Sequence, residues 1–124
     1  MLYDLKIEKK DDFLWVTATG RKRTLEIILA MARDILQACV ENKVTLVLLD
    51  IRPLEGLLEM MEAYDIPDKY FPKMKDPSVI TRIVIVDRKE SKRNNSFFEN
   101  VAVNRGFNLR IFSDPDKAFE WLKR

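Results

Sequence analysis

Residues 44–53 read Val-Thr-Leu-Val-Leu-Leu-Asp-Ile-Arg-Pro. Six of the first eight residues are apolar, and they do not alternate with polar ones. A strand with this pattern needs cover on both of its faces, as in a parallel sheet flanked by helices. The stretch therefore predicts a buried central strand over residues 44–51 of an α/β fold.

Four other stretches predict the remaining strands of the sheet. Residues 2–8 and 13–19 alternate between apolar and polar and are joined by a polar turn, which indicates an antiparallel hairpin. Residues 80–86 are mostly apolar, and Asp87 follows them as Asp50 follows the apolar run of residues 46–49. Residues 107–112 alternate toward a last strand. We therefore expect a five-stranded, mixed but mostly parallel sheet with an antiparallel hairpin at its N-terminal end.

Four helices are predicted between and after these strands. Thr24 is placed to cap a helix that runs to about residue 42, and residues 57–64 form a short second helix. Ser96 begins a Ser-x-x-Glu capping box that opens a third helix. Asp114 and the proline that follows it open the last helix.

The composition indicates one α/β domain over residues 1–124 with an ordinary charge balance. With 124 residues, of which 47% are hydrophobic, the chain can bury a core without disulfides or metals. Lys and Arg number 22 against 20 Asp and Glu, and the net charge of +2 gives no reason to expect nucleic acid as a partner. A single cysteine, no signal-like segment and no apolar run of membrane-spanning length lead us to expect a cytoplasmic protein.

The residue types disfavour catalysis. The chain has no histidine, which removes the commonest general base and a common metal ligand, and leaves nothing of that kind to activate Cys39. Asp50 and Asp87 each end a predicted strand and could bind Mg²⁺ or act as acid and base, but strand-end aspartates more often cap the following turn. We therefore expect no catalytic residue, no metal site and no cofactor, and a packing role for Cys39.

The first helix carries more apolar residues than one core-facing stripe needs. The stripe that helical spacing predicts consists of Leu25, Ile28, Leu29, Ala32, Ile35, Leu36 and Cys39. Ile27 and Met31 lie one turn apart and off this stripe. They are interpreted either as partly exposed apolar residues without a role or, together with residues 57–74, as the self-association face of a homodimer.

Two basic clusters lie in predicted loops. Residues 21–23 (Arg-Lys-Arg) precede a helix N-terminus and could help to hold a phosphate, but a solvated corner is the simpler interpretation. Residues 88–93 form a second basic loop. Neither cluster contains the interleaved aromatic residues on which bases stack, which disfavours a groove for single-stranded nucleic acid.

Several stretches together resemble the SpoIIAA-like branch of the STAS-like proteins. The resemblance rests on the opening hairpin, the capped first helix, the two buried strands, the arginine after the first of them, and the ending Phe112-x-Asp114-x-x-Lys117-Ala118-x-x-Trp121-Leu122. It covers nearly the whole chain, and the C-terminal ending is its most specific part. The resemblance implies a STAS-like α/β domain of five strands and about four helices, related to anti-sigma-factor antagonists and similar in fold to lipid-carrying Sec14-type modules.

The same resemblance implies a regulatory module rather than an enzyme. Antagonists that are switched by phosphorylation carry a serine in an Asp-Ser-x-Gly-type turn after the central strand. Here residues 50–56 read Asp-Ile-Arg-Pro-Leu-Glu-Gly, so the phosphorylatable serine is missing. We therefore expect a non-catalytic protein-interaction module that works without this switch.

Residues 57–74 are the stretch that we expect to bind a partner. Methionines and aromatics beside the carboxyl edge of a sheet adapt to varied apolar partners, although a crossover segment also needs an apolar side merely to cover the sheet. The alternatives are a surface for a protein partner and a pocket of about 300 Å³ or more for a lipid or other hydrophobic small molecule. The predicted binding residues are Asp50, Arg52, Leu57, Met61, Tyr64, Tyr70, Phe71 and Met74.

Overall fold

The central strand of the sheet is β3 (Leu46–Asp50), as its apolar run predicts. The computed structural model describes residues 2–74 and 76–124, and its five strands lie side by side in the order β1-β2-β3-β4-β5. The other strands are β1 (Tyr3–Lys9), β2 (Phe13–Gly20), β4 (Arg82–Val86) and β5 (Leu109–Phe112). Only β1 and β2 pair in antiparallel fashion, and every other neighbouring pair is parallel. The predicted mixed, mostly parallel sheet with an N-terminal hairpin is confirmed.

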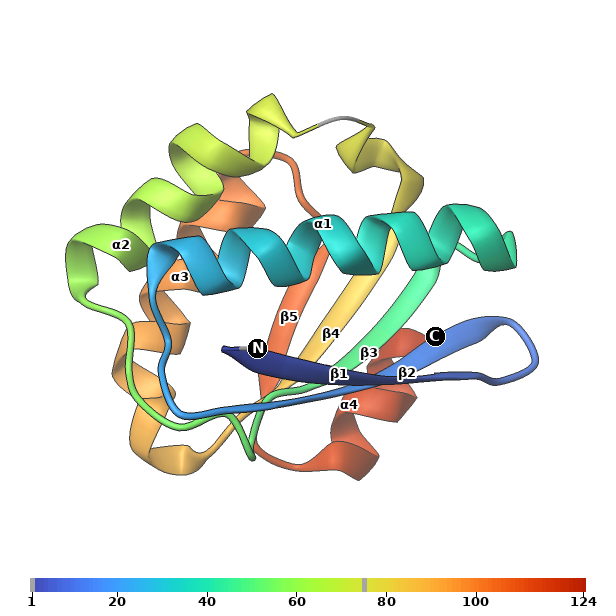
Figure 1. Ribbon diagram of the computed structural model, residues 1–124, viewed down its shortest axis with the longest axis horizontal. Coiled ribbons are helices and arrows are strands. Elements are labelled where there is room, and N and C mark those ends of the chain that lie inside the picture. The colour runs from blue at the N-terminus through green and yellow to red at the C-terminus, as the bar shows by residue number, and fades with distance from the viewer. Residues whose placement is uncertain (1, 75) are drawn as a thin grey trace.

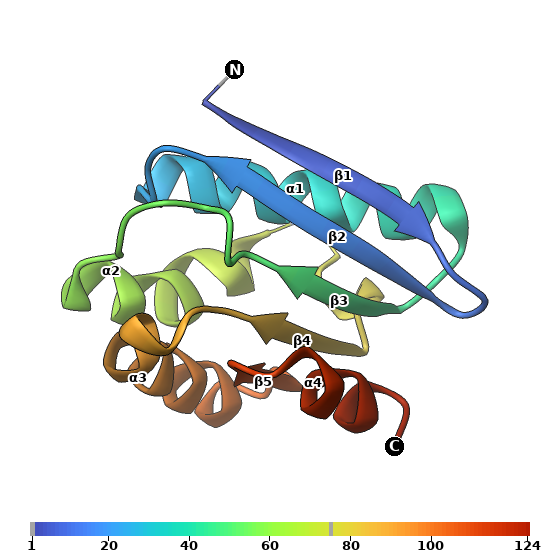
Figure 2. The ribbon, with the colours of Figure 1, turned by 90° about the horizontal axis from the view of Figure 1, so that it is seen from below.

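Four α-helices cover the two faces of this sheet (Figure 1). The helices are α1 (Leu25–Asn42), α2 (Met60–Asp65), α3 (Lys92–Asn104) and α4 (Pro115–Leu122). Residues of α1, α2 and α3 pack in one hydrophobic core, whereas α4 packs in a second core on the opposite face, beneath β3, β4 and β5 (Figure 2). The predicted α/β class with about four helices is confirmed.

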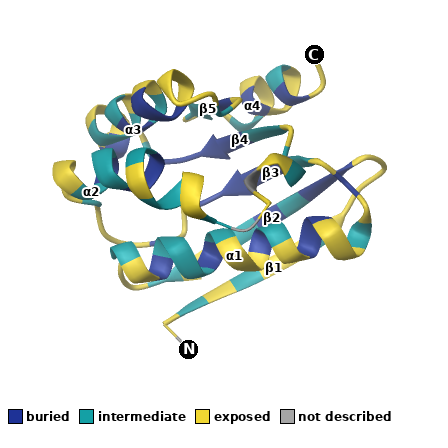
Figure 3. Ribbon diagram, turned by 90° about the horizontal axis from the view of Figure 1, so that it is seen from above, coloured by how far each residue is buried: buried dark blue, intermediate teal, exposed yellow. Residues whose placement is uncertain are grey.

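Successive residues of β3 enter different cores, which explains why this strand lacks a polar face. Val47 and Leu49 belong to the core under α1, and Leu48 belongs to the core under α4. All three side chains are buried, and Figure 3 shows the buried residues concentrated on the central strands while much of β1 is exposed. A strand covered on both faces has no reason to alternate.

Local signals place two helix starts where the sequence predicts them. The Thr24 hydroxyl accepts a hydrogen bond of 3.2 Å from the Ile27 N–H, and the Asp114 carboxylate accepts one of 2.9 Å from the Asp116 N–H. Pro115 occupies the first turn of α4, where a missing N–H costs nothing.

The predicted start of the third helix at Ser96 is wrong, because α3 begins at Lys92 after a short 3₁₀ turn, η4 (Lys89–Ser91). The carboxylate of Glu99, which the capping-box interpretation assigned to the helix start, instead accepts a hydrogen bond of 2.7 Å from the backbone N–H of Ile111. Glu99 thus satisfies an outward N–H of the edge strand β5.

The side of α1 that faces the sheet differs from the predicted stripe. Its buried residues are Ile27, Met31, Ile35, Ala38 and Cys39. Ile27 and Met31 are only 3% and 2% exposed, so the hypothesis that these two residues form a self-association face is wrong. Other predicted stripe residues, such as Ile28, are only half-buried beside the segment that follows α2. Cys39 packs as predicted, and burial raises the pKa of its thiol to about 11.

The proline-rich stretch after α2 forms a chain of short turns instead of one helix. A π-helical turn, η1 (Ile66–Tyr70), continues directly from α2, and two 3₁₀ turns follow as η2 (Phe71–Lys73) and η3 (Pro77–Val79). Proline removes one backbone donor and restricts the preceding residue, which prevents a continuous helix here. None of the helices in the described ranges combines the length and hydrophobicity needed to cross a membrane.

Candidate functional site

Asp50 and Arg52 form a closed turn at the carboxyl end of the central strand. One oxygen of the Asp50 carboxylate accepts hydrogen bonds of 3.0 Å from the Arg52 N–H and Nε–H, and the other accepts one of 2.8 Å from an Arg52 guanidinium nitrogen. The hydrogen bond to Asp50 raises the pKa of Arg52. This is the turn-capping arrangement, with the guanidinium still partly exposed to solvent.

Asp87, the second strand-end aspartate, pairs with Arg23 in the interior. The Arg23 guanidinium donates two hydrogen bonds, of 2.6 and 2.7 Å, to the two oxygens of the Asp87 carboxylate. The same guanidinium donates to the carbonyl oxygens of Ile51 and Leu54, at 3.0 and 2.9 Å. Arg23 therefore joins the start of α1, the turn after β3 and the end of β4 at one point, and it does not belong to a solvated corner.

The electrostatic environment of Asp87 stabilises its ionised form. Burial by itself raises the pKa of this carboxyl, but hydrogen bonds from Arg23 and Asn95, the positive charge of Arg23 and the Arg88 N–H together lower it below its ordinary value. Arg21 and Lys22, the other members of the same basic cluster, are exposed. The cluster thus contains two surface cations and one buried structural arginine.

Both strand-end aspartates accept hydrogen bonds from within the protein. Each carboxylate already receives two or more hydrogen bonds from an arginine and a backbone N–H. Within the described ranges, no three His, Cys, Asp or Glu side chains come together in a way that could hold a metal ion. The arrangement at this edge therefore serves to fix the turns that follow β3 and β4.

Leu57 and Met61 project from the turn and helix that follow, and they are the most solvent-exposed of the predicted binding residues. Their exposed fractions are 51% and 68%, and neighbouring Met60 is also exposed. The helix α2 begins three residues later than predicted, because Glu59 and Glu62 form a reciprocal capping box at its N-terminus. Leu57 consequently precedes the helix and is not held on one of its faces.

Tyr64 and Phe71 pack against α3 and its following turn. The Tyr64 ring lies 6.0 Å from that of Phe97, centroid to centroid. The Phe71 ring contacts Phe98 and Phe107 edge-on, with centroid separations of 5.9 and 5.7 Å. These aromatic pairs anchor the turns after α2 to the rest of the domain.

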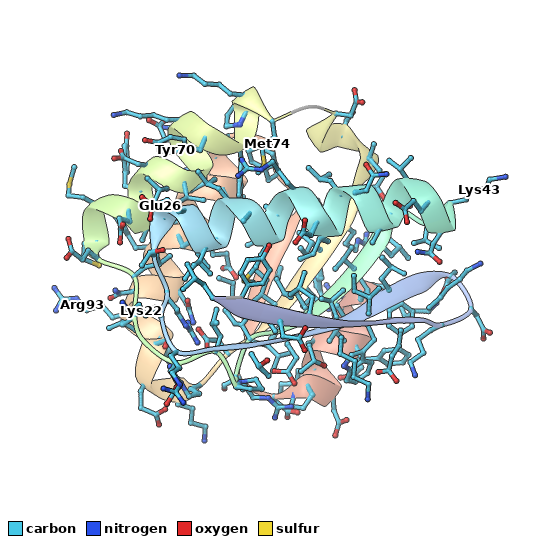
Figure 4. The ribbon with its side chains drawn as sticks, viewed as in Figure 1. Lys22, Glu26, Lys43, Tyr70, Met74 and Arg93 are labelled. Carbon is cyan, nitrogen blue, oxygen red and sulfur yellow. The ribbon has the colours of Figure 1, made fainter. Side chains whose placement is uncertain are left out.

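Tyr70 and Met74 lie along a groove between these turns and the outer side of α1 (Figure 4). The α1 side of the groove is formed mainly by Leu29, Leu36 and Val40. Met74 also borders an apolar cavity, which adjoins the groove. The eight predicted binding residues are therefore divided among a closed turn, an outer surface, an aromatic anchor and this groove.

The apolar cavity lies between α1, the turns after α2, α3 and the sheet, and it is partly open to solvent. Its volume is about 140 Å³ and its walls are mostly apolar. Phe71 and Met74 are the predicted binding residues that border it, and the remaining wall includes Ile28, Ala32, Leu36, Leu58 and Phe98. Sequence reasoning assigned Ile28, Ala32 and Leu36 to the helix core and missed their place in this wall, because helical spacing cannot tell a packed neighbour from a void.

Comparisons with known proteins agree on the fold. No protein-family model matches the sequence, and no curated protein matches it either. The structure is similar to the crystal structure of an anti-sigma factor antagonist from Mycobacterium paratuberculosis, with a TM-score of 0.61, 16% sequence identity, and coverage of 98% of this chain and 95% of that one.

A second solved structure has a similar fold. It is an uncharacterised protein of the DUF3478 family with a SpoIIAA-like fold from Shewanella loihica PV-4. The TM-score is 0.55 at 17% identity, and the alignment covers 97% of this chain and 93% of that one. Both likenesses span nearly the full length of each protein and confirm the predicted SpoIIAA-like, STAS-like fold.

Proposed function

We propose that this SpoIIAA-like domain is a non-catalytic regulatory module that binds a protein partner through the surface around α2. The observation that carries the proposal is the exposure of Leu57, Met60 and Met61, three large apolar side chains within five residues. We name these three residues the α2 surface. Clustered exposed apolar side chains beside the carboxyl edge of a sheet are typical of interaction sites.

The charges around the α2 surface indicate the kind of partner it fits. Residues 53–68 contain five acidic residues and no basic one. Asp65 and Asp68 are paired with Lys69 and Arg105, whereas Glu55 and Glu59 have no ion pair among the described residues. A partner with an apolar patch rimmed by Lys and Arg would complement this surface, because opposite charges around an interface favour encounter and orientation.

A non-catalytic role is supported by the chemistry at the strand ends. The carboxylates of Asp50 and Asp87 are occupied by arginines, and the turn over residues 50–56 has no hydroxyl residue. The Mycobacterium protein of similar fold is described as an anti-sigma factor antagonist. Regulation of the present chain would then depend on partner binding without phosphorylation of that turn.

Replacing both Leu57 and Met61 with lysine is expected to weaken partner binding strongly. Lysine removes the apolar contact and places two charges in the interface, which should weaken affinity on the order of 100-fold. The measurement is cross-linking and affinity purification from the native cells, followed by titration calorimetry with the purified partner. Both side chains are exposed, so the free energy of unfolding should change by less than about 1 kcal/mol.

Val40→Lys is the matched control, since Val40 is 54% exposed and lies near the opposite end of α1 from α2 (Figure 1). A partner retained by Val40→Lys and lost by the double variant supports the proposal. A partner that binds the double variant with unchanged affinity contradicts it. So does the absence of any protein that binds the purified unmodified chain directly.

The apolar cavity supports a second candidate function, the binding of a small apolar molecule. At about 140 Å³ the cavity is smaller than the volume of about 300 Å³ at which drug-sized ligand pockets begin. Apolar cavities of about 150 Å³ in other proteins remain dry and take up benzene or xenon. The ligand that fits is therefore the size of one aromatic ring, far below that of a lipid.

Benzene is the probe for this second candidate. Saturating the buffer with benzene is expected to raise the Tm of the unmodified chain by a few degrees, since a ligand that binds only the folded state stabilises it. Ala32→Leu places a larger side chain in the cavity wall and should remove most of this shift. Ala30→Leu, on the same helix but outside the wall, is the control. Equal shifts in all three proteins would refute binding in the cavity.

A further inference from the structure

A second, polar pocket lies at the carboxyl ends of β4 and β5. It adjoins the apolar cavity at Asn95 and Ile111 and shares no residue with the α2 surface. Its volume is about 390 Å³. The residues that line it come from the turn after β4, the first half of α3, the turn after β5 and the first turn of α4. In open α/β sheets this position, beyond the carboxyl ends of parallel strands, is where ligands commonly bind.

The first half of α3 forms one wall of the polar pocket. Lys92, Asn95, Ser96 and Glu99 all border it, and their spacing of three, four and seven residues places them on one helix face. The opposite wall contains Ser113 and Lys117, and Ile111 and Phe112 supply its apolar part. Two hydroxyl groups and several cationic side chains therefore face a common space.

The acidic side chains of the polar pocket accept hydrogen bonds from other groups of the protein. Asp87 is paired with the buried Arg23. Glu99 accepts a hydrogen bond from the backbone N–H of the edge strand, and Asp114 caps α4. Each carboxylate thus has a donor within the protein and offers little to a positively charged ligand.

The cationic groups, in contrast, are not neutralised. Lys89, Lys92 and Lys117 border the pocket, and none forms an ion pair with an acidic residue in the ranges 2–74 and 76–124. Arg88 also borders it. Its guanidinium donates a hydrogen bond of 3.1 Å to the Gly56 carbonyl, while its buried Nε–H has no acceptor among the described residues. The pocket therefore combines hydrogen-bonded carboxylates with three lysines that have no ion pair among the described residues, and its lining carries a local excess of positive charge.

We propose that the polar pocket binds the phosphate group of a small phosphomonoester. A phosphate dianion matches several lysines and hydroxyl donors better than a single carboxylate would, because it carries about two charges and three strong acceptor oxygens. The volume leaves room for a short organic group beside the phosphate. The pocket and the α2 surface share no residue, and the hydrogen bond from Arg88 to the Gly56 carbonyl links the pocket to the turn that precedes Leu57.

The test is a titration of ¹⁵N-labelled protein with glycerol 3-phosphate, followed by amide chemical shifts. We expect saturable shifts confined to residues 87–99 and 111–117. In Lys92→Gln/Lys117→Gln the Kd should rise about tenfold, since each exposed charge pair contributes modestly. Lys9→Gln/Lys10→Gln makes the same charge change at the β1–β2 hairpin, at the opposite edge of the parallel strands, and should leave the Kd unchanged.

A second arm separates a soluble ester from a lipid headgroup. Phosphatidylcholine vesicles with and without phosphatidic acid are sedimented with the unmodified protein and with both double variants. Co-sedimentation that requires phosphatidic acid and the two pocket lysines would assign the phosphate to a lipid, whereas soluble binding alone would assign it to a small metabolite. The proposal is overturned if neither form binds, or if the pocket variant and the hairpin variant behave alike.

Discussion

Replacing Arg23 with methionine is expected to lower the free energy of unfolding by about 3 to 5 kcal/mol, the usual cost of breaking a buried ion pair. The Arg23 side chain is only 4% exposed and that of Asp87 1%, so solvent cannot replace the lost partner. The carbonyl oxygens of Ile51 and Leu54 also lose a donor. Urea unfolding followed by circular dichroism measures the effect.

Arg21→Met is the matched control, because Arg21 lies two residues earlier and is exposed. Its effect should stay within about 0.5 kcal/mol. Adding Asp87→Asn to Arg23→Met should recover part of the loss, because the second change removes the unpaired buried charge. Equal effects of Arg21→Met and Arg23→Met would contradict the role assigned to the ion pair.

The Arg23→Met variant should also respond differently to pH. In the unmodified chain the folded-state pKa of Asp87 is below its unfolded value, so the carboxylate contributes stability that is complete above about pH 4 and is lost as the pH falls through the folded-state pKa. Without Arg23, burial dominates and raises the pKa of Asp87. The stability difference between the two proteins should therefore shrink as the pH is lowered from 7 toward 4.

This ion pair marks the limit of what the sequence could predict. Arg21 and Arg23 are the same residue type in one polar loop, and the partner that distinguishes them is 64 positions further along the chain. Local patterns do not contain such information. The buried strand β3 and the capped start of α4, by contrast, depend on neighbouring residues only, and both lie close to where the sequence places them.

The wrong predictions for the buried side of α1 and for the start of α3 have the same physical origin. α1 carries apolar residues on two adjacent lines, and only the presence of the turns after α2 decides that Ile27 and Met31 face the sheet while Ile28 and Ala32 face a cavity. Ser96 and Glu99 have the spacing of a capping box, but the carboxylate of Glu99 instead accepts a hydrogen bond from the backbone N–H of Ile111 in the edge strand β5. In both helices a tertiary contact takes precedence over a valid local signal.

The candidate site was predictable as a segment but not as a set of contacts. Within residues 57–74 the exposed large apolar side chains are Leu57, Met60 and Met61, and others, such as Val40 and Phe119, are exposed elsewhere. Which residues point outward depends on the aromatic anchor at α3, and the sequence does not show that anchor. Phe71 and Met61 lie ten residues apart in the same segment and have opposite environments.

Replacing Phe71 with alanine is expected to cost about 3 kcal/mol of unfolding free energy, near the lower end for loss of a packed phenylalanine because the ring is only half-buried. The change removes two edge-on aromatic contacts, to Phe98 and Phe107, and part of the cavity wall. The turns over residues 66–74 then lose their anchor to α3. Urea unfolding and amide hydrogen exchange measure the two consequences.

Met61→Ala provides the comparison within the same segment. Met61 is 68% exposed, so its truncation should change the free energy of unfolding by less than about 0.5 kcal/mol. In Phe71→Ala, hydrogen exchange should accelerate more over residues 66–74 than in β3, because local opening of an unanchored segment requires less free energy than opening of the central sheet. If exchange instead accelerates equally in both regions, Phe71 belongs to the global core and does not anchor these turns separately. If Met61→Ala destabilises as much as Phe71→Ala, then Met61 packs against the domain and the α2 surface cannot be a free interaction site.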